Sequence, residues 1–137
     1  EITALQPAGC KTLLNVNASY HKIADMGPFT KNSANTLLKL TLQTNVSVDS
    51  LFGASGVIFE LRVDDQPTTI GNATTFIKSQ GSSYPVSICG MYNSLSVGAH
   101  TVSLWVKAVS GTAKNAGWDK DCLNLQGTNN VLVEEYK

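Results

Sequence analysis

Residues 98–109 read GAHTVSLWVKAV, a stretch in which apolar and polar side chains alternate after a glycine. Alternation with a period of two is typical of a β-strand that buries one face and exposes the other. The inward set is Val102, Leu104, Val106 and Ala108, and the outward set is Thr101, Ser103, Trp105 and Lys107. The stretch therefore predicts a half-buried strand that carries one of the chain's two tryptophans on its outer face.

The same strand pattern recurs along the chain, in residues 36–48, 56–67, 74–79, 84–92 and 130–136. Glycine and serine separate these stretches at intervals of roughly ten residues, and no segment keeps a helical period over three turns. Short alternating strands with such turns predict an all-β fold, an antiparallel jelly-roll β-sandwich. The 137 residues are the size of one domain, 1–137, in which residues 109–129 are expected to form a long loop.

The charge and the hydrophobicity of the chain exclude some classes of partner. Ten basic and ten acidic residues give a net charge of zero, and no block of like charge stands out. Nucleic acids and anionic membranes are bound by concentrated Lys and Arg, so neither is an expected partner. No apolar run reaches the roughly 18–20 residues of a membrane span. The low charged fraction, 15%, favours a secreted, extracellular protein that self-associates, and the start at Glu1 suggests a processed secretory protein or an excised domain.

Three cysteines, Cys10, Cys89 and Cys122, lie too far apart in the sequence for a CxxC-type metal or redox site. We expect one disulfide and one remaining thiol, which is either buried or paired with another chain. The sequence leaves open which two cysteines pair.

Residues for catalysis are sparse, and the chain is not expected to be an enzyme. His21 and His100 stand in different segments and are interpreted as ordinary polar histidines rather than as a base or a metal pair. The paired carboxylates are Asp64 with Asp65, Asp119 with Asp121, and Glu134 with Glu135. Acid–base catalysis needs two carboxyls that face each other, whereas neighbours in a strand point to opposite faces and the first pair suits a turn.

A candidate binding loop surrounds Trp118. Its indole, beside Asp119 and Asn115, resembles the surfaces with which proteins bind sugars; the alternative is a tryptophan packed over the end of the sandwich. Asp119, Asp121 and Asn124 offer the hard oxygen ligands that calcium prefers, although their spacing matches no EF-hand. Apart from calcium, the sequence indicates no cofactor.

Trp105 is the second candidate ligand residue. With Ile58, Ile77 or Met91 it would form an outward apolar patch, the kind of surface that marks a partner or ligand site. The alternatives are a subunit interface, a groove for an apolar small molecule, and simple packing under loops.

Three sequons predict N-glycans if the source is eukaryotic, at Asn17, Asn45 and Asn72.

Two longer stretches, VSICGMYNSLSVGAHTVSLWVKAV (86–109) and NAGWDKDCLNLQGTNNVLVEEYK (115–137), resemble the globular C-terminal domain of the collagen-triple-helix-repeat-containing protein family. The matching positions are Cys89, Gly90, Gly98, Trp105, Val106, Gly117, Trp118 and Val131 to Glu135. The resemblance implies a C1q-like or tumour-necrosis-factor-like jelly roll that is secreted and forms a homotrimer. The chain departs from the family in having no Gly-X-Y stretch and no cysteine between Cys10 and Cys89.

These observations predict a secreted, non-enzymatic, oligomeric glycoprotein that serves as an extracellular binding module. Its expected partners are copies of itself and a glycan, as in a lectin-like protein, or an extracellular protein. The alternatives are a carrier of an apolar small molecule, held in a surface or intersubunit groove, and a structural component of the extracellular matrix.

Overall fold

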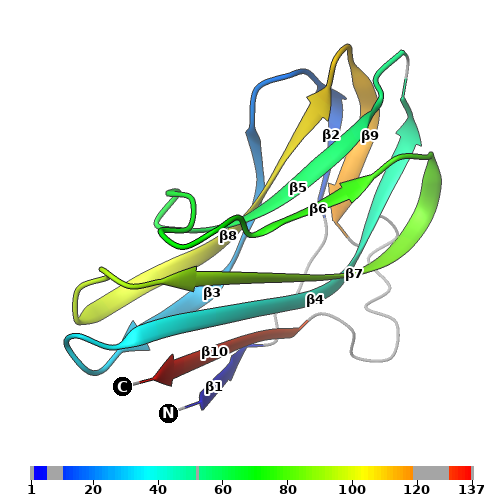
Figure 1. Cartoon of the computed structure of the whole chain (residues 1–137). Helices are drawn as coiled ribbons and strands as arrows, with labels where there is room; N and C mark the ends of the chain where they lie inside the picture. The colour runs from blue at the N-terminus through cyan, green and yellow to red at the C-terminus, as the bar shows by residue number, and fades with distance from the viewer. Residues whose placement is uncertain (1, 6–10, 52, 119–129, 137) are drawn as a thin grey trace.

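The computed structural model describes residues 2–5, 11–51, 53–118 and 130–136, and these form strands and turns without a helix (Figure 1). The strands are β1 (Ile2–Leu5), β2 (Lys11–Val16), β3 (His21–Lys31), β4 (Leu37–Ser50), β5 (Gly56–Val63), β6 (Thr74–Ile77), β7 (Gly81–Tyr92), β8 (Gly98–Val109), β9 (Ala113–Trp118) and β10 (Asn130–Tyr136). The described part of the chain thus contains no helix that could span a bilayer. The all-β prediction is confirmed.

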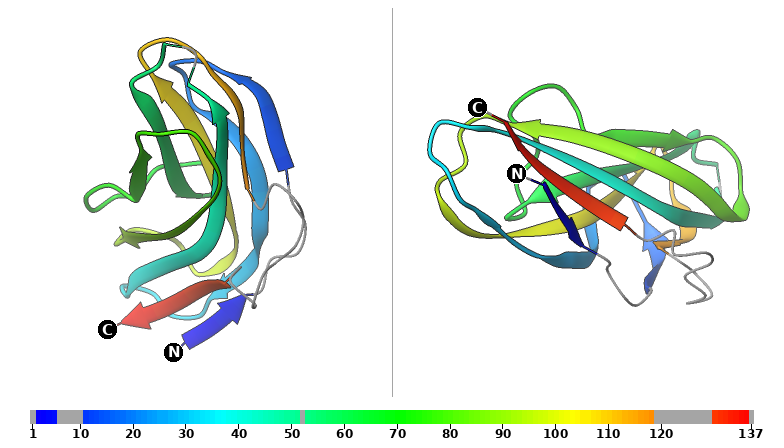
Figure 2. Two further views of the ribbon diagram at one scale, coloured as in Figure 1. Left: turned by 90° about the vertical axis from the view of Figure 1, so that its right-hand side faces the viewer. Right: turned by 90° about the horizontal axis from the view of Figure 1, so that it is seen from below.

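The strands form two antiparallel sheets that face each other (Figure 2). Sheet A has the order β1-β10-β4-β9-β2, with β7 on the other edge of β4, and sheet B has the order β3-β8-β5-β6. β10 and β9 pair with successive halves of β4, and β1 and β2 pair with β10 and β9. β10 and β9 therefore share one strand position beside β4, and β1 and β2 share the next one. Counted in this way, each sheet has four strand positions.

Numbered along the chain, the eight positions run 1-8-3-6 across sheet A and 2-7-4-5 across sheet B. This order is that of a jelly roll, in which two Greek keys wrap around one another. The antiparallel jelly-roll β-sandwich predicted from the sequence is confirmed.

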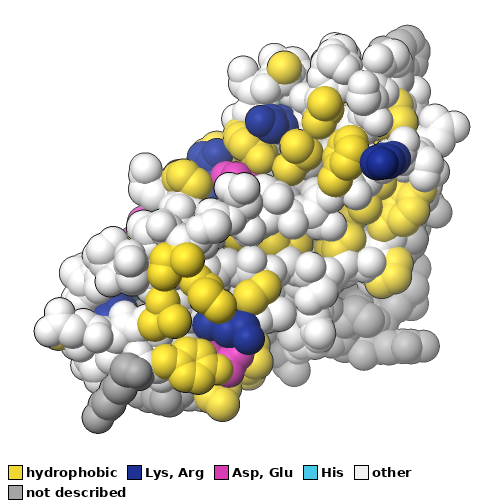
Figure 3. Space-filling view, viewed as in Figure 1, with side chains coloured by type: hydrophobic (Ala, Val, Ile, Leu, Met, Phe, Trp, Pro, Cys, Tyr) yellow, Lys and Arg dark blue, Asp and Glu magenta, His cyan; other side chains and the backbone are white. Residues whose placement is uncertain are grey.

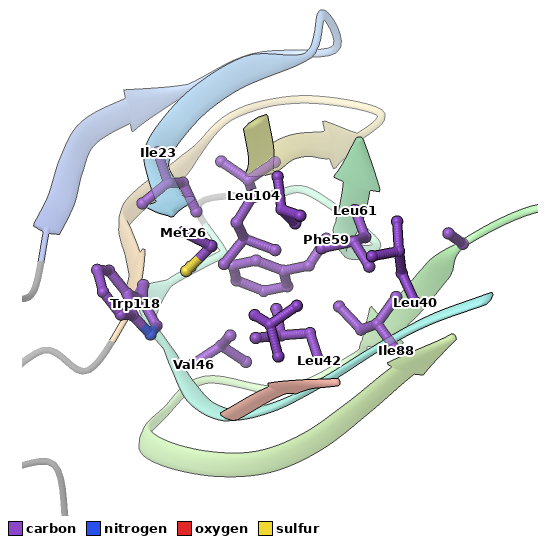
Figure 4. Packing of buried hydrophobic residues seen from close by; sticks show 14 of the residues in the cluster. Ile23, Met26, Leu40, Leu42, Val46, Phe59, Leu61, Ile88, Leu104 and Trp118 are labelled. Atoms are coloured by element: carbon purple, nitrogen blue, oxygen red, sulfur yellow. The ribbon is translucent and has the colours of Figure 1, made fainter. Parts of the chain in front are cut away.

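The core lies between the sheets and consists of alternate residues of their central strands. Phe59 and Leu61 of β5 and Leu104 of β8 meet Leu40 and Leu42 of β4, all five fully buried (Figure 4). The inward residues predicted for 98–109 are buried as well. Because side chains alternate across a strand, this core also fixes which residues of β5 and β8 face outward.

The alternation pattern did not predict β3, because this strand contains two bulges. Its buried apolar residues are Ile23, Met26 and Phe29, which lie three apart rather than two. Register shifts between Lys22 and Ala24 and between Asp25 and Gly27 each insert one residue. Gly27, with φ +113°, allows the second of these kinks.

The predicted loop 109–129 is wrong in its first half. Residues 113–118 form β9, which pairs with β2 and with the end of β4. Small residues, among them Ala113, Ala116 and Gly117, obscured the alternation. Residues 119–129 lie outside the described part of the chain.

A buried ion pair connects the β3–β4 turn to the last strand. Lys31 has 1% of its side chain exposed and lies 3.8 Å from Glu135 Oε1, and its ammonium donates to the carbonyl of Ser33. Glu135 also accepts from the Ser33 amide at 2.8 Å and from the Thr36 hydroxyl at 2.8 Å. Burial raises the pKa of Glu135, but these hydrogen bonds and the Lys31 charge lower it by more. The carboxylate is therefore the form that the fold stabilises.

Replacing Glu135→Ala should lower the free energy of unfolding by about 2–3 kcal/mol, because Lys31 then keeps a buried charge without its carboxylate. The neighbouring Glu134 points to the opposite face and interacts with the exposed Tyr136 hydroxyl. Glu134→Ala is thus the matched control and should cost about 0.5 kcal/mol or less. Urea denaturation of both variants measures the difference, and equal losses would contradict this role for the ion pair.

Candidate functional site

The outward side of sheet B carries a cluster of aromatic and charged side chains, which we call the aromatic face. Its members are Tyr20, Lys22, Ile58, Glu60, Arg62, Phe76, Ser103, Trp105 and Lys107. The strand register places Trp105 beside Lys22 on one side and Glu60 on the other. Figure 3 shows hydrophobic side chains together with lysine or arginine over the region where β5 and β6 lie in Figure 1.

Arg62 organises the centre of the aromatic face. Its guanidinium carbon lies 4.4 Å from the centroid of the Trp105 ring and 4.8 Å from that of Tyr20. The Lys107 ammonium lies 4.7 Å from the same tyrosine ring, and the Trp105 indole donates to the Ser103 hydroxyl at 2.8 Å. Both rings are half-buried, so cation–π contacts hold them while part of each ring stays exposed.

Glu60 balances the charge of Arg62 at the centre of the aromatic face. It is 9% exposed, and its Oε1 accepts from Arg62 Nε at 2.5 Å. Burial, the Glu60 charge and a hydrogen bond to Glu60 raise the pKa of Tyr20 to about 12. Tyr20 therefore keeps its hydroxyl proton at neutral pH. The rings, the guanidinium and the carboxylate are thus fixed relative to one another before any ligand arrives.

A surface hollow of about 360 Å³ borders the aromatic face where β3 bulges, and it is lined by Lys22, Ile23, Ala24 and Asp25. Lys22 pairs with Asp25 at 2.6 Å and with Asp65 at 2.9 Å. The hydrogen bonds to these two carboxylates raise the pKa of Lys22. The bulge therefore places charged hydrogen-bonding groups beside the aromatic rings.

Of the two interpretations of Trp118, the structure supports packing and not sugar binding. Its ring is 2% exposed, packs in the core near Met26 and Val46, and donates its indole hydrogen to Thr44 Oγ1 at 2.7 Å (Figure 4). A sugar cannot stack on this ring. Asn115 lies on β9, and its predicted companion Asp119 lies outside the described residues.

Trp105, by contrast, lies on the outward side of β8, as the sequence predicted. The apolar patch expected around it is only partly present. Ile58 shares the aromatic face, but Ile77 packs against the core and Met91 belongs to β7 in sheet A. The nearest neighbours of Trp105 are charged or polar, which a sequence pattern of apolar residues could not indicate.

Of the cysteines, Cys89 is exposed on β7 and makes no disulfide. Cys10 and Cys122 lie outside the described residues, so the predicted pairing remains a prediction. The same holds for a calcium site at Asp119, Asp121 and Asn124. Within the residues that the structure describes, no three His, Cys, Asp or Glu side chains gather in a way that could hold a metal ion.

The three sequons lie in different settings. Asn17 is exposed, and its side-chain oxygen accepts from the Ser19 amide at 2.9 Å. Asn45 lies within β4, where Ser47 of the same sequon is fully buried and its hydroxyl has no hydrogen-bond partner. Asn72 and the threonine of its sequon are both exposed. Glycosylation remains a prediction, for which Asn17 and Asn72 are exposed positions.

The two histidines lie near opposite ends of the β3–β8 pair, at His21↔Val106 and Phe29↔His100, and are too far apart to share a metal ion. His21 contacts Asn17 at 2.9 Å. His100 is 7% exposed and lies 2.6 Å from Asp64 and 2.8 Å from the carbonyl of Ser96. Since both of its neighbours are acceptors, each ring nitrogen of His100 has a place for a proton.

No family model matches the sequence, and no curated protein matches it. Among solved structures, the EclA C-terminal domain, a sugar-binding protein, aligns at TM-score 0.47 with 10% identity over 96% of this chain and 76% of its own. Eiger TNF from S. frugiperda aligns at 0.39 with 10% identity over 99% and 91%. The CBM22-1 xylan-binding domain of Paenibacillus barcinonensis Xyn10C aligns at 0.35 with 14% identity over 99% and 86%. At these values none of the three assigns a function to the chain.

The His100–Asp64 contact predicts a pH-dependent stability. Burial lowers the pKa of His100, but the hydrogen bonds to Asp64 and Ser96 raise it by more, against the repulsion of Lys31, so the net shift is upward. A raised folded-state pKa stabilises the fold below the unfolded-state value and loses this contribution as the pH rises through the folded-state value. The free energy of unfolding should therefore fall as the pH rises from the unfolded-state histidine pKa, about 6.5, through the higher folded-state value, and by less in His100→Asn. The same decrease in the variant, measured by urea denaturation, would contradict this.

Trp118→Phe should lower the free energy of unfolding by about 1–2 kcal/mol, because the buried hydrogen bond from the indole to Thr44 is lost. In a Thr44→Val background the same substitution should cost less, since that hydrogen bond is already absent. Denaturation of the four proteins tests this, and additive losses would show that the indole–hydroxyl contact contributes nothing.

Proposed function

We propose that this domain is an extracellular, non-enzymatic carbohydrate-binding module and that its site is the aromatic face of sheet B. The observation that carries the proposal is the guanidinium of Arg62 held between the rings of Trp105 and Tyr20 on the outward side of the sheet. Sheet B supplies a rigid base for this cluster, because the inward residues of β5 and β8 are fully buried.

A sugar ring has apolar C–H faces and a rim of hydroxyl groups. The exposed parts of Trp105 and Tyr20 offer flat apolar surface to the first, and the partly exposed Arg62 and Lys107 offer hydrogen-bond donors to the second. These groups already contact one another, so binding would freeze few side-chain rotations. Aromatic surface with a few fixed polar groups is the usual composition of a small-molecule site.

We assign no catalytic role to these residues. Glu60 is the carboxylate nearest the rings, and it is bound to Arg62 and hydrogen-bonded by Tyr20. Hydrolysis of a glycosidic bond needs two carboxyls that flank the bond. Among the described residues that make up the aromatic face, Glu60 is the single carboxylate, and its role is to hold Arg62 in place.

Secretion and assembly into a homotrimer belong to the same proposal. Their support is the low charged fraction, the zero net charge and the resemblance to the collagen-repeat family's C-terminal domain. The carrier alternative finds less support, because the neighbours of Trp105 are Arg62, Ser103 and Glu60 rather than an apolar groove.

On an array of oligosaccharides the purified protein should bind at least one class, and Trp105→Ala should weaken that binding at least tenfold, which is about 1.4 kcal/mol. Tyr20→Ala should act in the same direction, because it removes the second ring. Tyr136→Ala, which removes a 44% exposed ring from sheet A, is the control and should leave binding unchanged.

Calorimetric titration measures the affinities, and circular dichroism checks that each variant is folded. The proposal fails if the wild-type protein binds no glycan on the array, or if folded Trp105→Ala binds as tightly as wild type.

A further inference from the structure

We infer that the ligand of the aromatic face is an acidic oligosaccharide, a chain of several sugars with carboxylate groups, which lies across the four strands of sheet B. This inference rests on the proposed function and names the substrate class of the same site. Three observations carry it. A further exposed ring lies on β6, a row of side chains joins this ring to Tyr20 across the sheet, and the charges along that row are positive.

Phe76 is the further exposed ring, apart from Trp105 and Tyr20. It lies on β6, opposite Ile58 of β5, and is 43% exposed. Its ring occupies the space beside Gly56, where a Cβ atom would come within 2.3 Å of Phe76 Cε2. A residue without a side chain at position 56 thus lets an exposed ring rest on the sheet, as a stacking surface for a sugar would require.

A row of outward side chains runs across sheet B from Phe76 to Tyr20. Lys107 of β8 pairs with Ile58, and Ile58 pairs with Phe76. At the other end the Lys107 ammonium lies over the ring of Tyr20. Adjacent strands are about 4.8 Å apart, so the row from β3 to β6 spans about 14 Å. This is longer than a single sugar ring, and it suits a ligand of several units with one ring stacked near each end.

The charges along this row are positive. Lys107 lies against Tyr20, and the Lys78 ammonium lies 5.8 Å from the Phe76 ring. Among the described residues neither lysine forms an ion pair, whereas Arg62 pairs with Glu60 and Lys22 pairs with two aspartates. Lys107 and Lys78 therefore stand at the two ends of the row without a carboxylate among the described residues, and uronate groups of a ligand would complement them there.

The test uses an array on which each acidic oligosaccharide, such as an oligogalacturonate or a hyaluronan fragment, stands beside its carboxyl-reduced, neutral form. Wild-type protein should bind an acidic member at least tenfold more tightly than its neutral partner, and added salt should reduce this difference. Lys107→Gln and Lys78→Gln should each lower the preference. Lys39→Gln removes the same charge from β4 of sheet A and should leave the preference unchanged.

Chain length gives a separate readout. Phe76→Ala should weaken binding of the longest oligosaccharides at least fivefold and leave disaccharide binding unchanged, because a disaccharide does not reach from Tyr20 to β6. An equal loss for both lengths, or none for either, would overturn the extended site.

The two proposals fail differently. Equal binding of acidic and neutral partners, or tighter binding of the neutral form, overturns the acidic substrate class and leaves the carbohydrate-binding function standing. Binding to no member of any pair overturns both. An acidic preference that persists in both Lys107→Gln and Lys78→Gln overturns the assignment of these lysines to the site.

Discussion

The packing of β5 and β8 of sheet B against β4 of sheet A is the constraint on which the rest of the structure depends. Phe59, Leu61 and Leu104 are fully buried against Leu40 and Leu42. Because alternate side chains of a strand point to opposite faces, this packing leaves no freedom in the residues that face outward. A shift of register by one residue would move Trp105 into the core and Leu104 to the surface. The position of the aromatic face is therefore a consequence of the core.

The outward residues of sheet B are unusual because they include charges that are partly buried. Glu60 is nearly covered, although it lies on the outer side of the sheet. A buried carboxylate without a partner would be costly, and Arg62 and Tyr20 supply the compensating contacts. The same contacts hold two aromatic rings in place. Stability and preorganisation of the proposed site thus come from one set of interactions.

The sequence predicted the fold class well because apolar residues recur at every second position in β4, β5 and β8. It missed β3, whose bulges place Ile23, Met26 and Phe29 three residues apart, and β9, whose small residues carry no alternation. It also missed the short N-terminal strands β1 and β2. The site was harder to predict. Trp105 was recognised as outward, but Arg62 and Tyr20 lie more than forty residues away in the sequence. Trp118 looked like a loop residue and is instead buried at the end of β9 by contacts with Thr44 and the core.

The chain's two tryptophans allow the central claim to be tested in one measurement. The indole N–H of Trp105 lies on the aromatic face and that of Trp118 lies in the core, so each reports on one location. The ¹⁵N–¹H spectrum of the labelled protein, titrated with the best ligand from the glycan array, shows both signals. Our account predicts that the Trp105 signal shifts with saturation while the Trp118 signal stays in place. Saturable binding that leaves the Trp105 signal unmoved would place the ligand elsewhere and contradict the account.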